Sequence, residues 1–154
     1  TIAVQATPDY SDGDSVGPLL TLTNFARGVS GGSGIITRFQ LRSLINITVQ
    51  TFVHIFDANP SASTFTDNAA LSIHASDRSK LLKTFAIAAA DWVAPKGASP
   101  WYSVELIGPS ASMPYLYYDL SSGSREIYCA IEADGTINFS STGDLAAVIS
   151  AENN

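Results

Sequence analysis

Alternating apolar and polar positions recur along the chain at the two-residue period of a β-strand. The clearest stretches are residues 33–44 and 126–133. In the first, the apolar side carries Ile35, Thr37, Phe39 and Leu41, and the polar side carries Arg38, Gln40 and Arg42. In the second, one side carries Ile127, Cys129, Ile131 and Ala133, opposite Glu126, Tyr128, Ala130 and Glu132. Strands with one apolar and one solvated face are typical of antiparallel sheet.

Eight strands are predicted in total, separated by turns rich in glycine, proline, serine and asparagine. Their expected bounds are 19–25, 33–44, 48–56, 84–90, 101–107, 114–120, 126–133 and 145–151. One short helix is predicted at residues 76–82, with Ser76 as its N-cap. The pattern therefore predicts an all-β fold, a two-sheet antiparallel sandwich, and a jelly roll is the topology that eight strands suggest first. Strand order cannot be read from the pattern.

The chain is expected to form a single domain over residues 1–154, because this length lies in the usual range and no repeat or linker divides it. Residues 1–18 precede the first predicted strand and are interpreted as an extended N-terminal arm.

Composition excludes several classes of partner. The formal net charge of −6 repels phosphate backbones, and the eight basic residues are scattered, so nucleic-acid binding is not expected. No apolar run reaches the length of a membrane span. No signal-peptide pattern opens the sequence, and the lone Cys129 cannot form an internal disulfide, so we expect folding in the cytoplasm. Charged residues make up only 14% of the chain, which weakly indicates assembly with other protein.

A search for catalytic motifs predicts no enzyme. Residues 28–32 match the G-x-S-x-G pattern of hydrolases, but the residues that follow alternate as a strand, whereas that motif needs a helix there. Cys129 could pair with His54 or His74 as a thiol and base, yet it lies on an apolar strand face, where a free cysteine is ordinarily a small core residue. His54 is interpreted as a satisfied strand histidine.

No cofactor or metal is expected either. Asp9, Asp12 and Asp14 offer oxygen ligands suited to calcium, but the twelve-residue calcium loop with its terminal glutamate is not formed. An acidic, solvated turn is the better interpretation.

Aromatic side chains are the remaining candidates for binding, either by anchoring a partner protein or by stacking on a sugar. Alternation places Tyr102 on the inward face together with Val104 and Leu106. The candidate partner-binding residues are Tyr10, Trp92, Trp101, Tyr115 and Tyr117.

Residues 56–71, with the sequence FDANPSASTFTDNAAL, resemble a group of small tailed-bacteriophage virion proteins. The similarity extends to four further segments, 10–17, 31–35, 127–130 and 141–145. The resemblance implies a capsid decoration, or cement, protein that binds the outer surface of the assembled head and stabilises it. It also implies the major capsid protein as partner, a homo-oligomer of three copies, a β-rich fold and a location on the capsid surface. It assigns no individual contact residue.

Two hypotheses about function follow. The first is a non-enzymatic virion structural protein of the decoration type. It would bind through the area of its contact surface, and the many equivalent sites of a symmetric shell would multiply each contact. The alternative is a carbohydrate- or receptor-binding β-sandwich module of a tail or fibre, suggested by the tyrosines and tryptophans. A hydrolase that acts on cell-wall glycans is disfavoured, because no acid–base constellation is recognisable.

Overall fold

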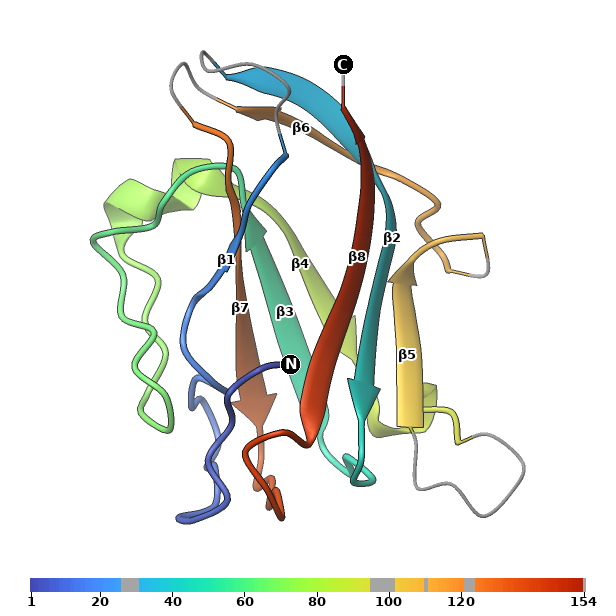
Figure 1. Cartoon of the computed structure of the whole chain (residues 1–154). Helices are drawn as coiled ribbons and strands as arrows, with labels where there is room; N and C mark the ends of the chain where they lie inside the picture. Colours follow the sequence, from blue (N-terminus) through green and yellow to red (C-terminus); the bar gives the residue numbers. More distant parts are fainter. Residues whose placement is uncertain (26–30, 95–101, 110, 121–123, 154) are drawn as a thin grey trace.

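The computed structural model describes residues 1–25, 31–94, 102–109, 111–120 and 124–153. The predicted all-β sandwich is confirmed, with eight antiparallel strands in two sheets (Figure 1). The strands are β1 Leu20–Leu22, β2 Gly32–Ser43, β3 Gln50–Phe56, β4 Leu81–Ile87, β5 Tyr102–Ile107, β6 Leu116–Leu120, β7 Ile127–Asp134 and β8 Leu145–Asn153. Each overlaps the strand predicted for its part of the chain.

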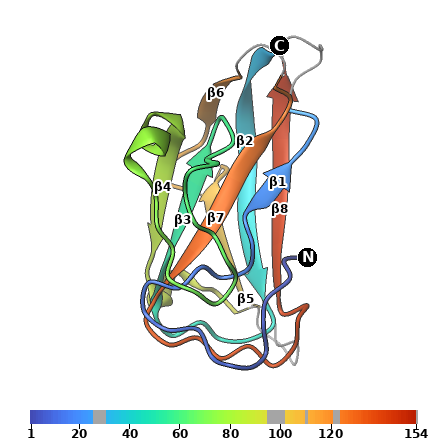
Figure 2. The same cartoon turned by 90° about the vertical axis from the view of Figure 1, so that its left-hand side faces the viewer.

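The first sheet, here called sheet I, has the order β1-β7-β3-β4. The second, sheet II, is built around the long strand β2, which pairs with β8 along one edge and with β5 and β6 along the other. This order is consistent with the predicted jelly roll: among the described strands, β3 and β4 are the only immediate sequence neighbours that pair with each other, and the other pairings join strands distant in the chain. Turned by 90°, the molecule shows sheet I in front of sheet II, with β7 crossing in front of β2 and β1 in front of β8 (Figure 2).

The main core fills the space between the two sheets. Strand β2 contributes Ile36, Phe39 and Leu41, each about 1% exposed, and β3 and β7 supply the facing side chains. The alternation predicted for residues 33–44 is wrong at its start. A bulge between Ile36 and Arg38 in the pairing with β8 shifts the period by one residue, so Ile36, and not Ile35, shares the inward face with Phe39.

In sheet I, most of β7 and the end of β3 are buried on both faces, whereas the pattern predicted one solvated face. Tyr128 and Ala130 of β7 are buried with Phe56 in a second apolar cluster on the outer face. The chain between β3 and β4 covers this face, and Phe65 and Leu71 of that segment pack on the cluster (Figure 1). Residues 57–80 thus act as a third layer over the sandwich, which alternation along β7 alone could not reveal.

The predicted helix at 76–82 is a 3-10 helix, Ala75–Lys80, followed directly by β4. His74, and not Ser76, is its N-cap, and the His74 ring accepts from the Ser76 amide. Because the helix ends at Lys80, β4 starts three residues before its predicted position and ends at Ile87. A second short 3-10 helix, Ala89–Asp91, follows.

The N-terminal segment, residues 1–18, contains bends and turns and lies against the sandwich. Ile2 bridges to Leu145, and Tyr10 bridges to Ile137. The side chains of Ile2, Val4 and Tyr10 are all buried. No helix within the described ranges is long and apolar enough to span a membrane.

Candidate binding cleft beside strand β6

The five predicted partner-binding residues fall into three groups. Tyr115 and Tyr117 are exposed, at 53% and 69% of their surface. Tyr10 and Trp92 are buried, at 0% and 6%, so the expectation that they present a ring to a partner is corrected for these two. Trp101 lies outside the described residues. The two exposed tyrosines are therefore the part of the set that the structure makes available for binding.

Both tyrosines belong to β6 and its approach, where burial alternates strictly. Leu116, Tyr118 and Leu120 face the core, while Tyr117 and Asp119 face outward. Tyr118 is held in place on the core side of β6, since its hydroxyl donates to the Phe25 carbonyl at 2.8 Å and its ring packs edge-on against that of Phe25. The exposed side chains of Tyr117 and Asp119 thus lie on a strand whose other face packs in the core.

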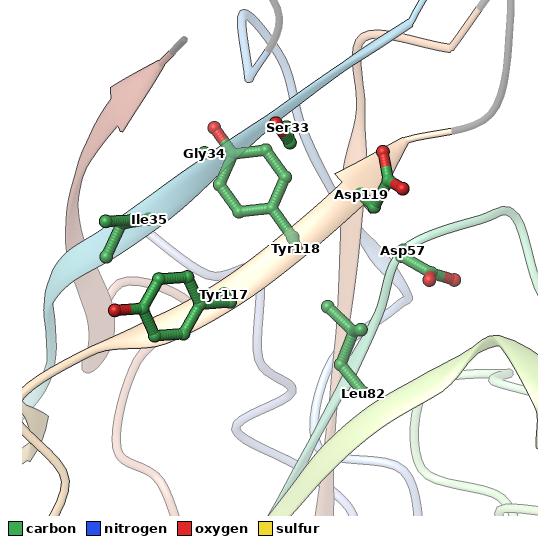
Figure 3. A pocket seen from close by; sticks show the side chains of 8 residues that line it. All are labelled: Ser33, Gly34, Ile35, Asp57, Leu82, Tyr117, Tyr118 and Asp119. Atoms are coloured by element: carbon green, nitrogen blue, oxygen red, sulfur yellow. The ribbon is translucent and has the colours of Figure 1, made fainter.

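A cleft of about 420 Å³ runs beside β6. Strand β2 contributes its first residues to the wall, and β6 contributes the row from Tyr117 to Asp119. The opposite side is formed by Asp57, which directly follows β3, and by Leu82 of β4. Figure 3 shows Asp57 approaching β6 on the side of Asp119, while the Tyr117 ring lies further along the same strand. The cleft therefore combines an aromatic ring, an apolar floor and two carboxylates, drawn from both sheets.

Close packing beneath the cleft requires a glycine at position 34. A Cβ there would lie 2.5 Å from the Glu152 carbonyl and within the van der Waals radius of the Tyr118 hydroxyl. The absence of a side chain at Gly34 lets the Tyr118 ring pass under β2 toward Phe25.

The charge of the cleft is negative. Its charged lining residues are Asp57 and Asp119. Partial burial raises the pKa of Asp57 above its ordinary value against the opposing effect of a backbone hydrogen bond, and the nearby Asp119 carboxylate adds a smaller rise. Among the described residues, the ion pairs involve neither carboxylate. The cleft thus holds a partly buried carboxylate, Asp57, near an exposed one, Asp119, and in the described ranges neither forms an ion pair.

A second cleft, of about 460 Å³, lies further along β4 on the same open side of the sandwich. Phe85 and Ile87 of β4 face Val104 and Leu106 of β5 across it. Glu105 and Asp91 are its charged lining residues. The side of the molecule where β4 faces β5 and β6 is therefore hollowed at two places, and both hollows are acidic.

Of the two histidines, His54 is the buried one, and both of its ring nitrogens form polar contacts. Its Nδ1 lies 2.9 Å from the Thr84 hydroxyl and its Nε2 lies 2.9 Å from Glu132, so both ring nitrogens are satisfied across three strands. An imidazole in contact with both a carboxylate and a hydroxyl has the composition of a proton relay. His54 is nonetheless 7% exposed and lines neither cleft, which agrees with the interpretation of a satisfied strand histidine.

The other candidates for chemistry have structural surroundings. Cys129 is fully buried, and desolvation raises the pKa of its thiol to about 12, which disfavours the thiolate. The Asp14 carboxylate accepts from the Ser11 amide at 2.7 Å, as in a self-capped turn. No group of three potential metal ligands occurs in the described part of the chain. Most of the G-x-S-x-G motif lies outside the described residues.

The acidic side of the cleft could not be found from the sequence. Asp57 follows β3 and Asp119 lies on β6, more than sixty residues further along the chain, and only the packing of the two sheets brings them together. In the sequence, Asp57 is notable only as the first residue of a turn after a strand. An aspartate at such a position is explained equally well by hydrogen bonds from its side chain to the nearby backbone.

Comparisons with known proteins identify no relative: no protein-family model, no curated protein and no solved structure matches the chain.

Proposed function

We propose that the protein is a non-enzymatic phage virion structural protein of the capsid decoration type, which binds the outer surface of the assembled head. In this proposal the major capsid protein is its partner, and the protein itself assembles as a homo-oligomer of three copies. The proposal rests on the sequence resemblance described above.

One structural observation supports giving weight to that resemblance. Three of the segments that carry it, residues 10–17, 56–71 and 127–130, are far apart in the chain but lie together in the fold. The Ser15 amide donates to the Ala69 carbonyl at 2.9 Å, and the Leu71 amide donates to the Gly13 carbonyl at 2.8 Å. The first two segments are therefore bonded directly to each other.

Strand β7 completes this unit. The Val16 amide donates to the Ile131 carbonyl at 2.8 Å, and Phe56 packs with Tyr128 and Ala130. Residues that form one packed unit are constrained together, so a resemblance spread over these segments describes a single structural feature.

The surface chemistry is compatible with docking on a shell. Tyrosines such as Tyr115 and Tyr117 bring large contact area at a low cost in conformational entropy. Tyr117 lies on β6, whose other face packs in the core, and Tyr115 directly precedes that strand, so little ordering would accompany binding.

The test is attachment to shells. Purified protein is added to heads from the source phage that lack it, and bound copies are counted after sedimentation. We expect saturation at a simple ratio to the shell protein and a higher temperature of head disruption. Heads that bind no protein, or only traces without saturation, would contradict the proposal.

The alternative, a glycan-binding tail or fibre module, predicts a different outcome. Such a module would bind a glycan array and would leave head stability unchanged. The same preparation can be used for both assays.

A further inference from the structure

We propose that the cleft between β6, Asp57 and Leu82 is a docking site for an arginine side chain of a partner protein. The inference deepens the proposed function and rests on it only for the identity of that partner. Binding of arginine at the cleft can be tested without any capsid.

The shape of the cleft suits a long side chain with a flat charged end. Tyr117 and Asp119 are separated by one residue on β6, so their Cα atoms lie roughly 6.6 Å apart. Figure 3 shows the Tyr117 ring at one place along the strand and the two carboxylates at another. An arginine lying along β6 can place its aliphatic stem on Tyr117 and Leu82 and its guanidinium at the carboxylates.

The charges favour a cation. Asp57 and Asp119 are close enough for the charge of Asp119 to raise the pKa of Asp57. In the described part of the chain, neither carboxylate forms an ion pair with a basic side chain. A guanidinium relieves this repulsion and donates paired hydrogen bonds to carboxylate oxygens. It also interacts favourably with the face of a tyrosine ring.

Other ligands fit less well. A neutral sugar could stack on Tyr117, but it would bury the carboxylates further without cancelling their charge. A divalent cation prefers six or more oxygen ligands, and the cleft supplies two carboxylates. The net charge of −6 adds a long-range attraction for a basic partner surface.

The experiment is an NMR titration of the whole protein with N-acetyl-arginine amide. N-acetyl-citrulline amide, which has nearly the same shape without the charge, is the matched ligand. We expect arginine to shift the amide signals of Tyr117, Asp119 and Asp57 with a dissociation constant in the millimolar range, and citrulline to leave them in place. Because the pKa of Asp57 is raised, arginine binding should weaken on acidification sooner than an ordinary aspartate would predict.

Variants locate the site. Asp57→Asn and Asp119→Asn should each weaken arginine binding about tenfold, since each removes a charge-assisted contact. Tyr117→Ala should weaken it by a smaller factor. Asp9→Asn and Tyr115→Ala are the matched controls, because both residues are exposed and neither lines the cleft.

Three results would overturn the inference: no shifts with arginine, equal shifts with arginine and citrulline, or stronger shifts with a methyl pyranoside. The last would assign the cleft to saccharides. Failure here is separable from failure of the proposed function. Heads that still bind Asp57→Asn at wild-type affinity contradict the arginine site alone, whereas heads that bind no wild-type protein contradict the decoration role alone.

Discussion

At the scale of single residues, Tyr10 shows how a side chain suited to binding can serve structure instead. Its hydroxyl donates to Asp67 Oδ1 at 2.6 Å and accepts from the Gln5 amide at 2.7 Å. The same carboxylate oxygen accepts from the Gly17 amide at 2.8 Å. The Tyr10 ring also meets Phe139 edge-on. One phenol therefore ties the N-terminal segment to the chain that follows β3.

Tyr10→Phe tests this tie. Removal of the hydroxyl leaves Gln5 and Asp67 with unmade hydrogen bonds, so we expect the free energy of unfolding to fall by about 1–3 kcal/mol. Urea denaturation measures it. Tyr115→Phe is the control, because Tyr115 is exposed, and it should change stability little. An equal effect of the two substitutions would contradict the role assigned to Tyr10.

Gly34 is the second residue whose role depends on close packing. Gly34→Ala should displace the Tyr118 ring or β8 and lower the free energy of unfolding by about 1–3 kcal/mol. Gly143→Ala is a matched control, since the nearest atom to its Cβ would lie at an ordinary 3.8 Å. Thermal unfolding of the two variants should differ clearly, and similar unfolding would show that β2 and β6 are less tightly packed than described.

At the scale of elements, residues 57–80 are held by one buried acid. Asp77 is 1% exposed and accepts from the Ala62 amide, the Ser63 hydroxyl and Lys80 Nζ at 2.7–2.9 Å. The Lys80 contact, followed by that of Ser63, lowers the pKa of Asp77. The segment thus has a polar centre at Asp77 and an apolar one at Phe56 and Phe65.

Asp77→Asn should lower the melting temperature at neutral pH. Because the folded pKa is lowered, the carboxylate stabilises the fold above its unfolded pKa, about 3.9, and this stabilisation is lost as pH falls through the folded value. The difference between Asp77→Asn and wild type should therefore shrink in acid. Calorimetry at several pH values measures it, with Asp12→Asn as an exposed control. A pH-independent difference would contradict the role of charge at Asp77.

The elements themselves were largely predictable, because strand alternation is local. What alternation could not supply depends on other parts of the chain. The bulge after Ile36 reflects pairing with β8, more than a hundred residues away. The burial of Tyr128 depends on the covering segment, whose apolar contacts at Phe65 and Leu71 are isolated in sequence. For the same reason the exposed Tyr117 was predictable from alternation, and its acidic neighbours were not.

At the scale of the whole molecule, the fold buries several tyrosine and cysteine side chains that are neutral and that ionise by losing a proton at alkaline pH. Burial, aided by Glu126, raises the pKa of Tyr128 to about 12, and burial raises that of Cys129 to about 12. The pKa values of Tyr10 and Tyr118 are also raised by burial. All four groups are neutral in the fold, and three of them lie in the main core or against it.

The contribution of these groups to stability should therefore be constant below their unfolded pKa values, about 8.5 for cysteine and 10 for tyrosine, and fall as pH rises toward 12. Melting temperatures between pH 8 and pH 12 measure this, and Cys129→Ala should flatten the first part of the decline. An unchanged melting temperature up to pH 12 would contradict the burial of these groups.

The central claim, that this β-sandwich is a structural component of a phage head, is tested most directly on virions. The measurement is the copy number of this protein relative to the major shell protein, by quantitative mass spectrometry of purified particles. The account predicts a ratio near that of the shell. A trace amount, pointing to the tail or portal, or complete absence from the particle would contradict it.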